Sequence, residues 1–286
     1  MTADPALVLG WLVLAHLVAD FVFQTEHMAT AKFGNGVDAW RALGAHVAVV
    51  GAFTVPVIAA YGLPGLTFAA LTIGTHLLID RAKIVLTRAA EPRPAGGAEP
   101  TAEAIAAGPP MDRAWTATPG ALFAFDQVVH LVVLFIGWIV FLARTPPLDW
   151  FTSVIDGIRG GNDPTLFHHG VLTVVVIAAL VIINVRAASL FVATLVRAPV
   201  TPRDVGRASE ARVGAVIGVL ERLLICALVL GGAVGTIGFV IAAKTIARFK
   251  QLEDRQFAEY YLMGTLASVT IAVSSSLLAQ AVLANA

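Results

Sequence analysis

Three apolar stretches of the sequence each place a histidine and an aspartate four residues apart. The pairs are His16 and Asp20 in HLVADFVFQ, His76 and Asp80 in HLLID, and Asp126 and His130 in FDQVVH. Residues four apart lie on one face of an α-helix, so each pair presents an imidazole and a carboxylate together. Two chemistries require such pairs, namely binding of a metal ion and proton relay.

The ligand types favour metal binding over proton relay. Imidazole nitrogens and carboxylate oxygens suit Zn, Mn or Fe(II), and a further apolar stretch adds a fourth histidine. We predict four histidine ligands, which are His16, His46, His76 and His130. Three carboxylates are predicted to ligate the metal, to orient a histidine or to act as general base: Asp20, Asp80 and Asp126. The set is large enough for one metal ion or two.

The composition predicts an all-α polytopic transmembrane bundle. Of the 286 residues, 58% are hydrophobic and 13% charged, and the mean hydropathy is +0.82. Soluble domains are roughly half apolar and a quarter charged. The formal net charge of zero argues against nucleic-acid binding. The lone cysteine, Cys226, excludes a disulfide framework within the chain and a cysteine-based metal motif.

Eight apolar segments approach the length that crosses a bilayer, roughly 17 to 25 residues. They are residues 6–24, 42–61, 64–88, 119–142, 169–193, 213–231, 233–249 and 258–283. The segment 233–249 is short, and if it is re-entrant the chain has seven spans. We expect the first segment to be a retained span, because no convincing signal-peptide cleavage site follows it.

The spans are expected to fall into two membrane parts joined outside the membrane. Residues 1–142 form a four-span bundle with the His/Asp site, and 169–286 form a C-terminal bundle. Between them, 143–168 carries Trp150, Phe151 and scattered charges, which suits an external segment in the membrane interface. Residues 90–114 are rich in Ala, Pro, Gly and Glu, a composition typical of a flexible loop.

The basic residues predict the orientation of the spans. If eight spans alternate, nearly all lysines and arginines of the loops fall on one side, and only Arg144 and Arg159 clearly fall on the other. The positive-inside rule makes the crowded side cytoplasmic and puts both termini outside. Each aspartate is then the more cytoplasmic member of its pair, with its histidine about one turn, roughly 6 Å, deeper.

The common depth of the three pairs favours a functional site. An ionisable group inside a span costs at least about 2.5 to 3.5 kcal/mol on insertion scales, so such groups normally face the bundle interior. The alternative is structural, with each aspartate satisfying a neighbouring histidine or backbone group and helping helices to associate. Three pairs and His46 at one level of the cytoplasmic leaflet are more than helix association requires.

Further polar side chains near these pairs are candidates for substrate binding. Gln24 lies one turn beyond Asp20 and would line the opening of the site, and Gln127 follows Asp126 directly. Lys83 lies within one turn of Asp80, where it would bind an anionic headgroup or extend its ammonium to the interface.

The C-terminal third carries its own charged set, for which two interpretations stay open. The first is an intramembrane ion-pair network in which the acidic residues Glu221 and Glu259 pair with basic ones. The second is a phosphate or headgroup site, for which guanidinium groups offer planar bidentate donors. Its candidate substrate-binding residues are Arg222, Lys244 and Arg248. We favour the network, and the two interpretations are compatible.

Several motifs together resemble a known family. They are HLVADFVFQTE, HLLIDRAK, FDQVVH, IGVLERLL and IGFVIAAKTIARFKQLEDRQFAEYYLMGTLASV. In this order they resemble a bacterial integral-membrane family known as domain of unknown function 3307. Residues 1–142 carry the family-like histidine and aspartate signatures, and roughly 205–280 look like the C-terminal extension of some members. The resemblance implies a helical membrane fold and a place in the bacterial inner membrane, but no activity.

These observations favour an inner-membrane metal-dependent hydrolase acting on a lipid or lipid-linked substrate at the cytoplasmic leaflet. The metal would activate water and polarise an ester or phosphoryl oxygen. The alternative is a metal-ion or proton-coupled transporter that uses the same pairs, although transporters more often place their site near the midplane. A third possibility is a regulatory or assembly protein without enzymatic activity, whose cytoplasmic loop binds a partner. Homo-oligomerisation stays open.

Overall fold

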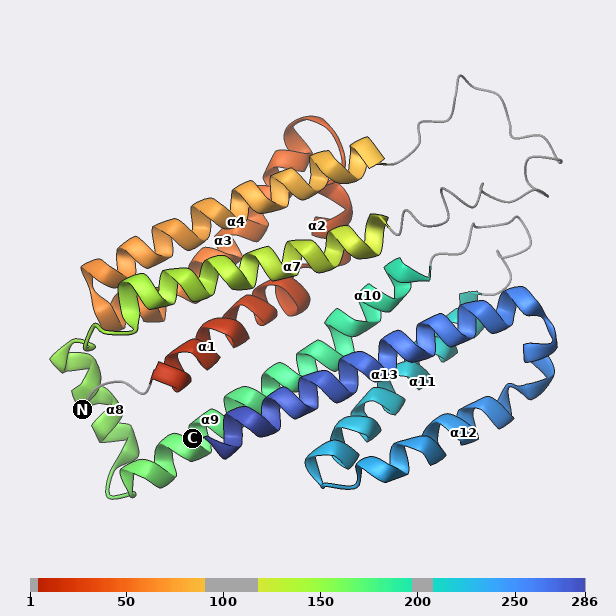
Figure 1. Cartoon of the computed structure of the whole chain (residues 1–286). Coiled ribbons are helices and arrows are strands. Elements are labelled where there is room, and N and C mark those ends of the chain that lie inside the picture. Colours follow the sequence, from red (N-terminus) through yellow and green to blue (C-terminus); the bar gives the residue numbers. More distant parts are fainter. Residues whose placement is uncertain (1–4, 91–117, 197–207, 286) are drawn as a thin grey trace.

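The computed structural model describes residues 5–90, 118–196 and 208–285. Within these ranges every regular element is a helix and none is a strand, so the predicted all-α class is confirmed for them. Most of the helices run side by side in an elongated bundle (Figure 1). Apart from Ala90, the predicted flexible loop 90–114 lies outside the described residues.

Seven helical stretches of the described chain are long and apolar enough to cross a membrane, which defines a membrane protein. They are Pro5–Phe23, Gly36–Tyr61, Leu63–Arg88, Gly120–Leu142, Pro164–Leu195, Val213–Leu230 and Phe257–Ala284. Each coincides with a predicted span. The remaining predicted segment, 233–249, contains the shorter apolar helix Val234–Ala247.

The first half of the chain forms a bundle around one apolar core. Helix α1 (Pro5–Val18) continues as the π-helix η1 (Ala19–Phe23), and the short α2 (Glu26–Ala31) follows. Helices α3 (Gly36–Tyr61) and α4 (Leu63–Ala90) form a hairpin through Gly62, whose φ of 62° suits glycine. Helix α7 (Thr118–Gly137), extended by the π-helix η2 (Trp138–Leu142), packs against α4. The core includes Leu12, Val57, Phe68 and Leu134.

A short helix closes one end of this bundle. Helix α8 (Asp149–Arg159) begins next to Leu148, whose backbone N–H donates to the carbonyl of Ala60 at 2.7 Å. Trp150, Val154 and Ile158, spaced four residues apart, form an exposed apolar stripe along α8. Such an amphipathic helix at the end of a bundle suits the bilayer interface, as predicted for this segment. That this end lies outside the cell stays a prediction.

The remaining helices form the second half and join it to the first. Helices α9 (Pro164–Ile182) and α10 (Ala188–Leu195) are linked by the π-helix η3 (Ile183–Ala187). They contact α1 and α7 on one side and α13 (Arg255–Ala284) on the other (Figure 1). Helix α11 (Ala208–Leu230) packs against α13, and η5 (Val234–Thr236), α12 (Ile237–Ala247) and η6 (Phe249–Glu253) complete the half.

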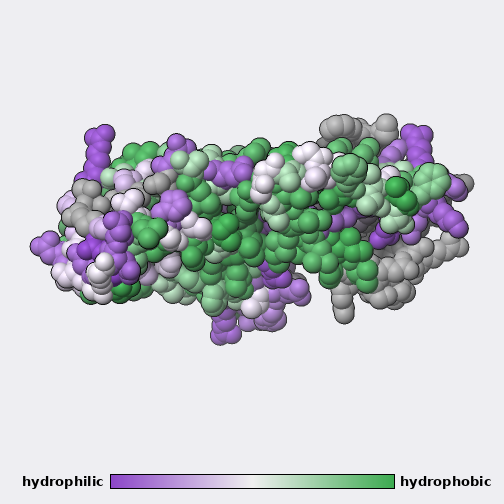
Figure 2. All heavy atoms as spheres, turned by 90° about the horizontal axis from the view of Figure 1, so that it is seen from below, coloured by the Kyte–Doolittle hydropathy of each residue, from purple (hydrophilic) through white to green (hydrophobic). Residues whose placement is uncertain are grey.

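The surface agrees with a membrane location. Figure 2 shows apolar side chains over much of the middle of one face, whereas hydrophilic side chains gather toward the two ends and at the lower edge of the view. Many large apolar side chains of the long helices are exposed, among them Leu78, Phe125 and Phe239. Exposed apolar surface on this scale is typical of helices that face the hydrocarbon of a membrane.

Candidate metal centre

All seven predicted histidines and aspartates converge inside the first bundle. We call this group the His/Asp cluster: His16 from α1, Asp20 from η1, His46 from α3, His76 and Asp80 from α4, and Asp126 and His130 from α7. Their side chains are nearly inaccessible, because each residue is only 0–8% exposed. The helical spacing that defined the three pairs therefore does direct them to one interior point.

The donor atoms around Asp20 have the spacing of a metal site. Its Oδ1 lies 3.6 Å from Nε2 of His46, 3.6 Å from Nε2 of His76 and 3.8 Å from Nδ1 of His16. Oδ2 of Asp80 lies 3.6 Å from Nε2 of His46. In a tetrahedral zinc site with metal–ligand distances near 2.0–2.1 Å, donor atoms are ~3.4 Å apart. The observed distances differ from this value by only a few tenths of an ångström.

One donor pair is closer than a metal site requires. Nε2 of His76 and Nε2 of His46 are 2.9 Å apart, a hydrogen-bond distance at which one nitrogen carries the proton. If both nitrogens bound one metal ion, that proton would leave and the two rings would separate by roughly 0.5 Å. Without metal the two imidazoles are hydrogen-bonded to each other. A small displacement of the rings would let both nitrogens bind one metal ion.

Gln127 fixes the proton positions on one side of the cluster. Its amide NH₂ donates to Oδ2 of Asp126 at 3.0 Å and to Oδ2 of Asp20 at 3.4 Å. Its carbonyl oxygen must then accept from Nε2 of His16, 3.4 Å away. If this imidazole is neutral, its unprotonated Nδ1 then faces Asp20. Two acceptors face each other there, and a cation between them would satisfy both.

Other acceptors of the cluster also lack donors. Nδ1 of His130 donates to the backbone carbonyl of Asp126 at 2.9 Å, so Nε2 of the neutral ring is an acceptor. That Nε2 is buried without a hydrogen-bond partner, as are Oδ1 of Asp20 and Oδ1 of Asp126. Each unsatisfied buried polar group costs about 1–3 kcal/mol. The concentration of acceptors indicates a place for a positively charged ligand.

Two lysines neutralise two of the three carboxylates. Nζ of Lys32 lies 2.8 Å from Oδ2 of Asp80, and Nζ of Lys83 lies 2.7 Å from Oδ2 of Asp126. Among the described residues, no lysine or arginine reaches Asp20, whose ion-pair contacts are all with imidazoles. With neutral histidines the cluster therefore carries one uncompensated negative charge, which is costly in a buried site.

The loop before α3 places Lys32 over the cluster. Thr25 caps α2 by accepting from the backbone N–H of Met28 at 3.2 Å, which starts the turn that folds back over the bundle. Arg88 from α4 then donates to the carbonyl oxygens of Phe33 at 2.8 Å and of Gly34. No helical spacing in the sequence connects Lys32 with Asp80, so this contact was not predicted.

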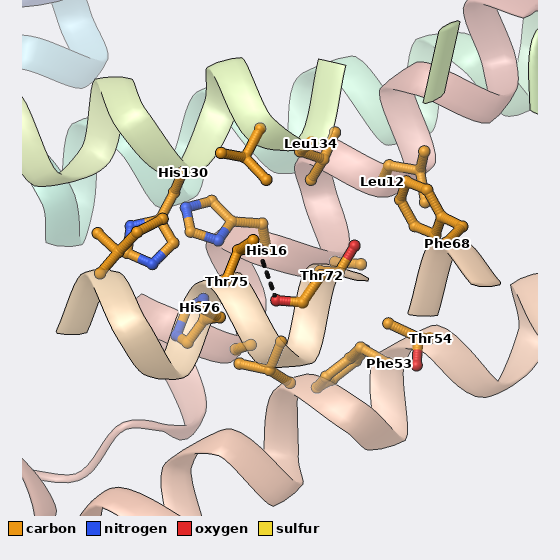
Figure 3. Close-up of a pocket in the computed structure, with 15 residues that line it drawn as sticks. Leu12, His16, Phe53, Thr54, Phe68, Thr72, Thr75, His76, His130 and Leu134 are labelled. Atoms are coloured by element: carbon orange, nitrogen blue, oxygen red, sulfur yellow. Dashed lines mark hydrogen bonds between the residues drawn. The ribbon is translucent and has the colours of Figure 1, made fainter. Parts of the chain in front are cut away.

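A small cavity adjoins the histidines on the side away from the lysines. Its volume is about 30 Å³, and His16, His76 and His130 line one end of it (Figure 3). Leu12, Thr54 and Phe68 lie toward the other end, with Thr72, Thr75 and Leu134 between the two ends. The lining is mainly apolar, with the imidazoles at one end, and the volume is about that needed by one water molecule.

The remaining predicted residues of the first half lie at the cluster or at its edge. Lys83 and Gln127 bind its carboxylates, as described above. Lys83 also lies over the ring of Phe123, 5.2 Å from the centroid. Gln24 follows η1 at its C-terminal end, and its buried amide nitrogen has no hydrogen-bond partner. Substrate binding by these three residues stays a prediction.

The charged residues of the C-terminal third do not reach the His/Asp cluster, because α9 and α10 lie between (Figure 1). Glu221 pairs with Lys244 at 2.5 Å, whereas Glu259 pairs with Arg255 at 2.9 Å on the surface. The expected network is thus divided into separate pairs. Arg248 donates to Oε1 of Gln251 at 2.8 Å.

Arg222 is buried among neutral partners and belongs to neither ion pair. Its Nε donates to the backbone carbonyl of Asn184 at 2.7 Å, Nη1 to Ser268 at 2.9 Å and Nη2 to Ser189 at 2.5 Å. We call these four residues the Arg222 cluster. Since the guanidinium is engaged in helix contacts, the phosphate or headgroup role predicted for it finds no support in this geometry.

The helices and the buried His/Asp cluster together define a membrane protein with an intramembrane polar site. The family described as "Protein of unknown function (DUF3307)" matches residues 8–158, which include the whole cluster. The match covers more than half of the chain, so the protein belongs to this family. It ends before residues 205–280, for which a resemblance was also expected. Comparisons with curated proteins and with solved structures give no match.

Proposed function

We propose that the protein binds a divalent metal ion, Zn, Mn or Fe(II), in the His/Asp cluster and uses it for hydrolysis. The substrate would be a lipid or lipid-linked molecule, and the location the bacterial inner membrane. One observation carries the proposal, namely the surroundings of Asp20. Its Oδ1 accepts no hydrogen bond, has no lysine or arginine partner among the described residues, and lies 3.6 Å from two imidazole nitrogens.

A single divalent ion would account for two features of the cluster, the uncompensated charge of Asp20 and the acceptors without donors. The ion would neutralise the negative charge of Asp20. It would also bind the lone pairs of the carboxylate oxygen and of the imidazole nitrogens that face it. The donor set is Asp20, His46 and His76, with His16 and Asp80 close enough to complete it. Three protein ligands and an open position are typical of catalytic zinc sites.

Hydrolysis is favoured by the cavity beside the histidines. A metal-bound water has a lowered pKa and becomes a nucleophile at neutral pH, and the metal also polarises the oxygen of an ester or phosphoryl group. The cavity of about 30 Å³ provides room for such a water next to His16 and His76. Lys83, the more exposed of the two lysines with 18% of its side chain accessible, is placed to meet an anionic group of the substrate.

Transport is less favoured, because the polar residues stop halfway along the bundle. Beyond the cavity, the apolar side chains of Leu12, Val57, Phe68 and Leu134 pack against one another without a polar path. A transporter would need this core to open during each cycle, whereas a hydrolase needs access from one side alone. The observed packing therefore supports the enzyme over the transporter.

Metal analysis of the purified full-length protein tests the proposal. We expect about one Zn, Mn or Fe per chain, and loss of that metal in the His46→Ala/His76→Ala variant. The matched control is His168→Ala/His169→Ala, which alters two histidines at the start of α9 and should keep the metal. Absence of metal from the wild-type protein, also after incubation with each of the three ions, would refute the proposal.

A second measurement distinguishes the two uses of the metal. The loaded protein is reconstituted into vesicles made from bacterial lipid extract, and both lipid turnover and metal flux are followed. Hydrolysis predicts new lipid products without net movement of the ion. Accumulation of the ion inside the vesicles without lipid products would show transport instead.

A further inference from the structure

A hydrogen bond joins the second half of the chain to the segment that carries Asp20, where the π-helices η1 and η3 meet. Nε of Arg186 in η3 donates to the backbone carbonyl of Phe21 in η1 at 3.1 Å. Phe21 follows Asp20 directly, and its side chain is buried. Arg186 lies outside residues 8–158, the part of the chain that the family matches.

The contact gives a backbone carbonyl at the C-terminal end of η1 a hydrogen-bond donor. Helix η1 ends at Phe23, so the last carbonyl groups of this helix have no intrahelical N–H to accept from. A guanidinium at a helix C-terminus also complements the partial negative charge of the helix dipole there. Arg186 therefore supplies both a donor and a charge at the turn that carries Asp20.

The helix that carries Arg186 is itself held in place by the Arg222 cluster. The Arg222 guanidinium binds the carbonyl of Asn184, two residues before Arg186. The amide of Asn184 donates to Ser275 of α13 at 3.1 Å. Hydrogen bonds from α11 and α13 thus fix η3, and Arg186 extends this fixed element to η1.

We propose that Arg186 is a positioning residue for the metal centre. It holds the backbone at Phe21 and thereby keeps Oδ1 of Asp20 within reach of the histidine nitrogens. The inference rests on the proposed function, because it assigns Arg186 a role in the affinity of that site for metal. Ligand sets need supporting contacts that hold them within about 0.5 Å of the productive geometry. Loss of such a contact typically weakens metal binding 10- to 100-fold.

The experiment compares Arg186→Gln with the wild-type protein and with the control Arg255→Gln. Arg255 also belongs to the second half, but its side chain is 93% exposed and pairs only with Glu259 among the described residues. Affinity for the metal ion found in the wild type is measured by chelator competition on monodisperse protein. We expect about tenfold weaker binding for Arg186→Gln and no change for Arg255→Gln.

Two further measurements separate positioning from a general loss of stability. Arg186→Lys should restore most of the affinity, because an ammonium can also donate to the carbonyl of Phe21. Hydrogen exchange of the metal-free protein should become faster at residues 19–24 in Arg186→Gln, while α3 and α4 stay protected. If Arg186→Gln does not fold, Arg186→Met, which keeps the apolar stem, and Arg186→Lys are measured in its place.

The outcomes keep this inference apart from the metal proposal. If the wild-type protein binds metal and Arg186→Gln binds it equally tightly, the positioning role is wrong and the metal site stands. A wild-type protein without metal affinity would overturn both the metal site and the role assigned to Arg186 in its affinity. Hydrogen exchange would then still report whether the contact holds η1. Unchanged exchange at residues 19–24 would show that it does not.

Discussion

Two buried polar clusters differ in how their charges are satisfied: the His/Asp cluster lies within the first bundle, and the Arg222 cluster joins η3 and α10 to α11 and α13. The guanidinium of Arg222 donates to three neutral oxygens, from Asn184, Ser189 and Ser268. In the His/Asp cluster, by contrast, the carboxylate oxygen Oδ1 of Asp20 faces imidazole nitrogens and accepts no hydrogen bond. A charge saturated by neutral partners holds helices together. A buried carboxylate oxygen without a donor beside imidazole nitrogens suits the cation that we propose.

The largest effect that would test this contrast is expected for Asp20→Asn. The amide keeps the shape of the carboxylate but removes its charge, so metal affinity should fall at least about 100-fold, or about 3 kcal/mol. The metal-free variant should unfold at no lower a temperature than the metal-free wild type, because an unpaired buried charge is gone. Titration calorimetry and thermal unfolding in detergent measure the two quantities. Strong destabilisation without metal would show that Asp20 is structural.

Arg222→Met should lower the stability of the protein much more than its affinity for metal. Three oxygen atoms lose a charged donor, which we expect to lower the free energy of unfolding by about 3 kcal/mol. Metal affinity should fall by less than the about tenfold expected for Arg186→Gln, because Arg222 acts on the metal centre only indirectly, through η3 and Arg186. The same calorimetry and unfolding measurements apply. A loss of metal affinity as large as that of Asp20→Asn would mean that the two clusters act as one unit.

Lys32→Met should tighten metal binding while destabilising the metal-free protein. The ammonium of Lys32 now neutralises Asp80 at 2.8 Å, so its removal frees a candidate ligand and removes a repelling charge. We expect about tenfold higher affinity, or about 1.4 kcal/mol, measured by chelator competition. Lys250→Met, which removes an exposed lysine, is the control. Weaker binding in Lys32→Met would indicate that the lysine supports the metal site instead of competing with it.

The smallest effects are expected for the two separate ion pairs of the second half. Glu221, whose side chain is 18% exposed, pairs with Lys244, and Glu221→Gln should destabilise by about 1 kcal/mol. Glu259 is 65% exposed, and Glu259→Gln should change stability by less than about 0.5 kcal/mol. Neither should alter metal affinity. Equal losses in the two unfolding experiments would argue that both glutamates belong to one network.

The sequence predicted the convergence of the seven cluster residues because two regularities were sufficient. Apolar segment length marked the helices, and the four-residue spacing placed each histidine and its aspartate on one helix face. Since ionisable groups avoid lipid, those faces had to turn toward one another. His46 has no aspartate partner in its own helix, so only its depth in the membrane predicted that it belongs to the cluster. In the structure its Nε2 lies 2.9 Å from Nε2 of His76.

The contacts that sequence analysis missed come from segments without such regularity. Lys32 reaches Asp80 because a short helix folds back and Arg88 holds the following loop, which no periodicity predicts. The contact between Arg186 and Phe21 depends on two π-helices, whose widened turns have no signal in the hydrophobic pattern. The predicted network of Glu221 and Glu259 relied on charge alone, and helix packing separated the two.

The position of Asp20 in the first span has a consequence for biosynthesis. The span is made before the helices that carry most of its partners, and Gln127, whose amide donates to the carboxylate, is 107 residues further along the chain. His46 and His76 also emerge later, on two separate spans. Until these helices are made, His16 of the same span is the one member of the His/Asp cluster beside this carboxylate. Shielding by the insertion machinery or by lipid headgroups has to last until the fourth helix has been inserted.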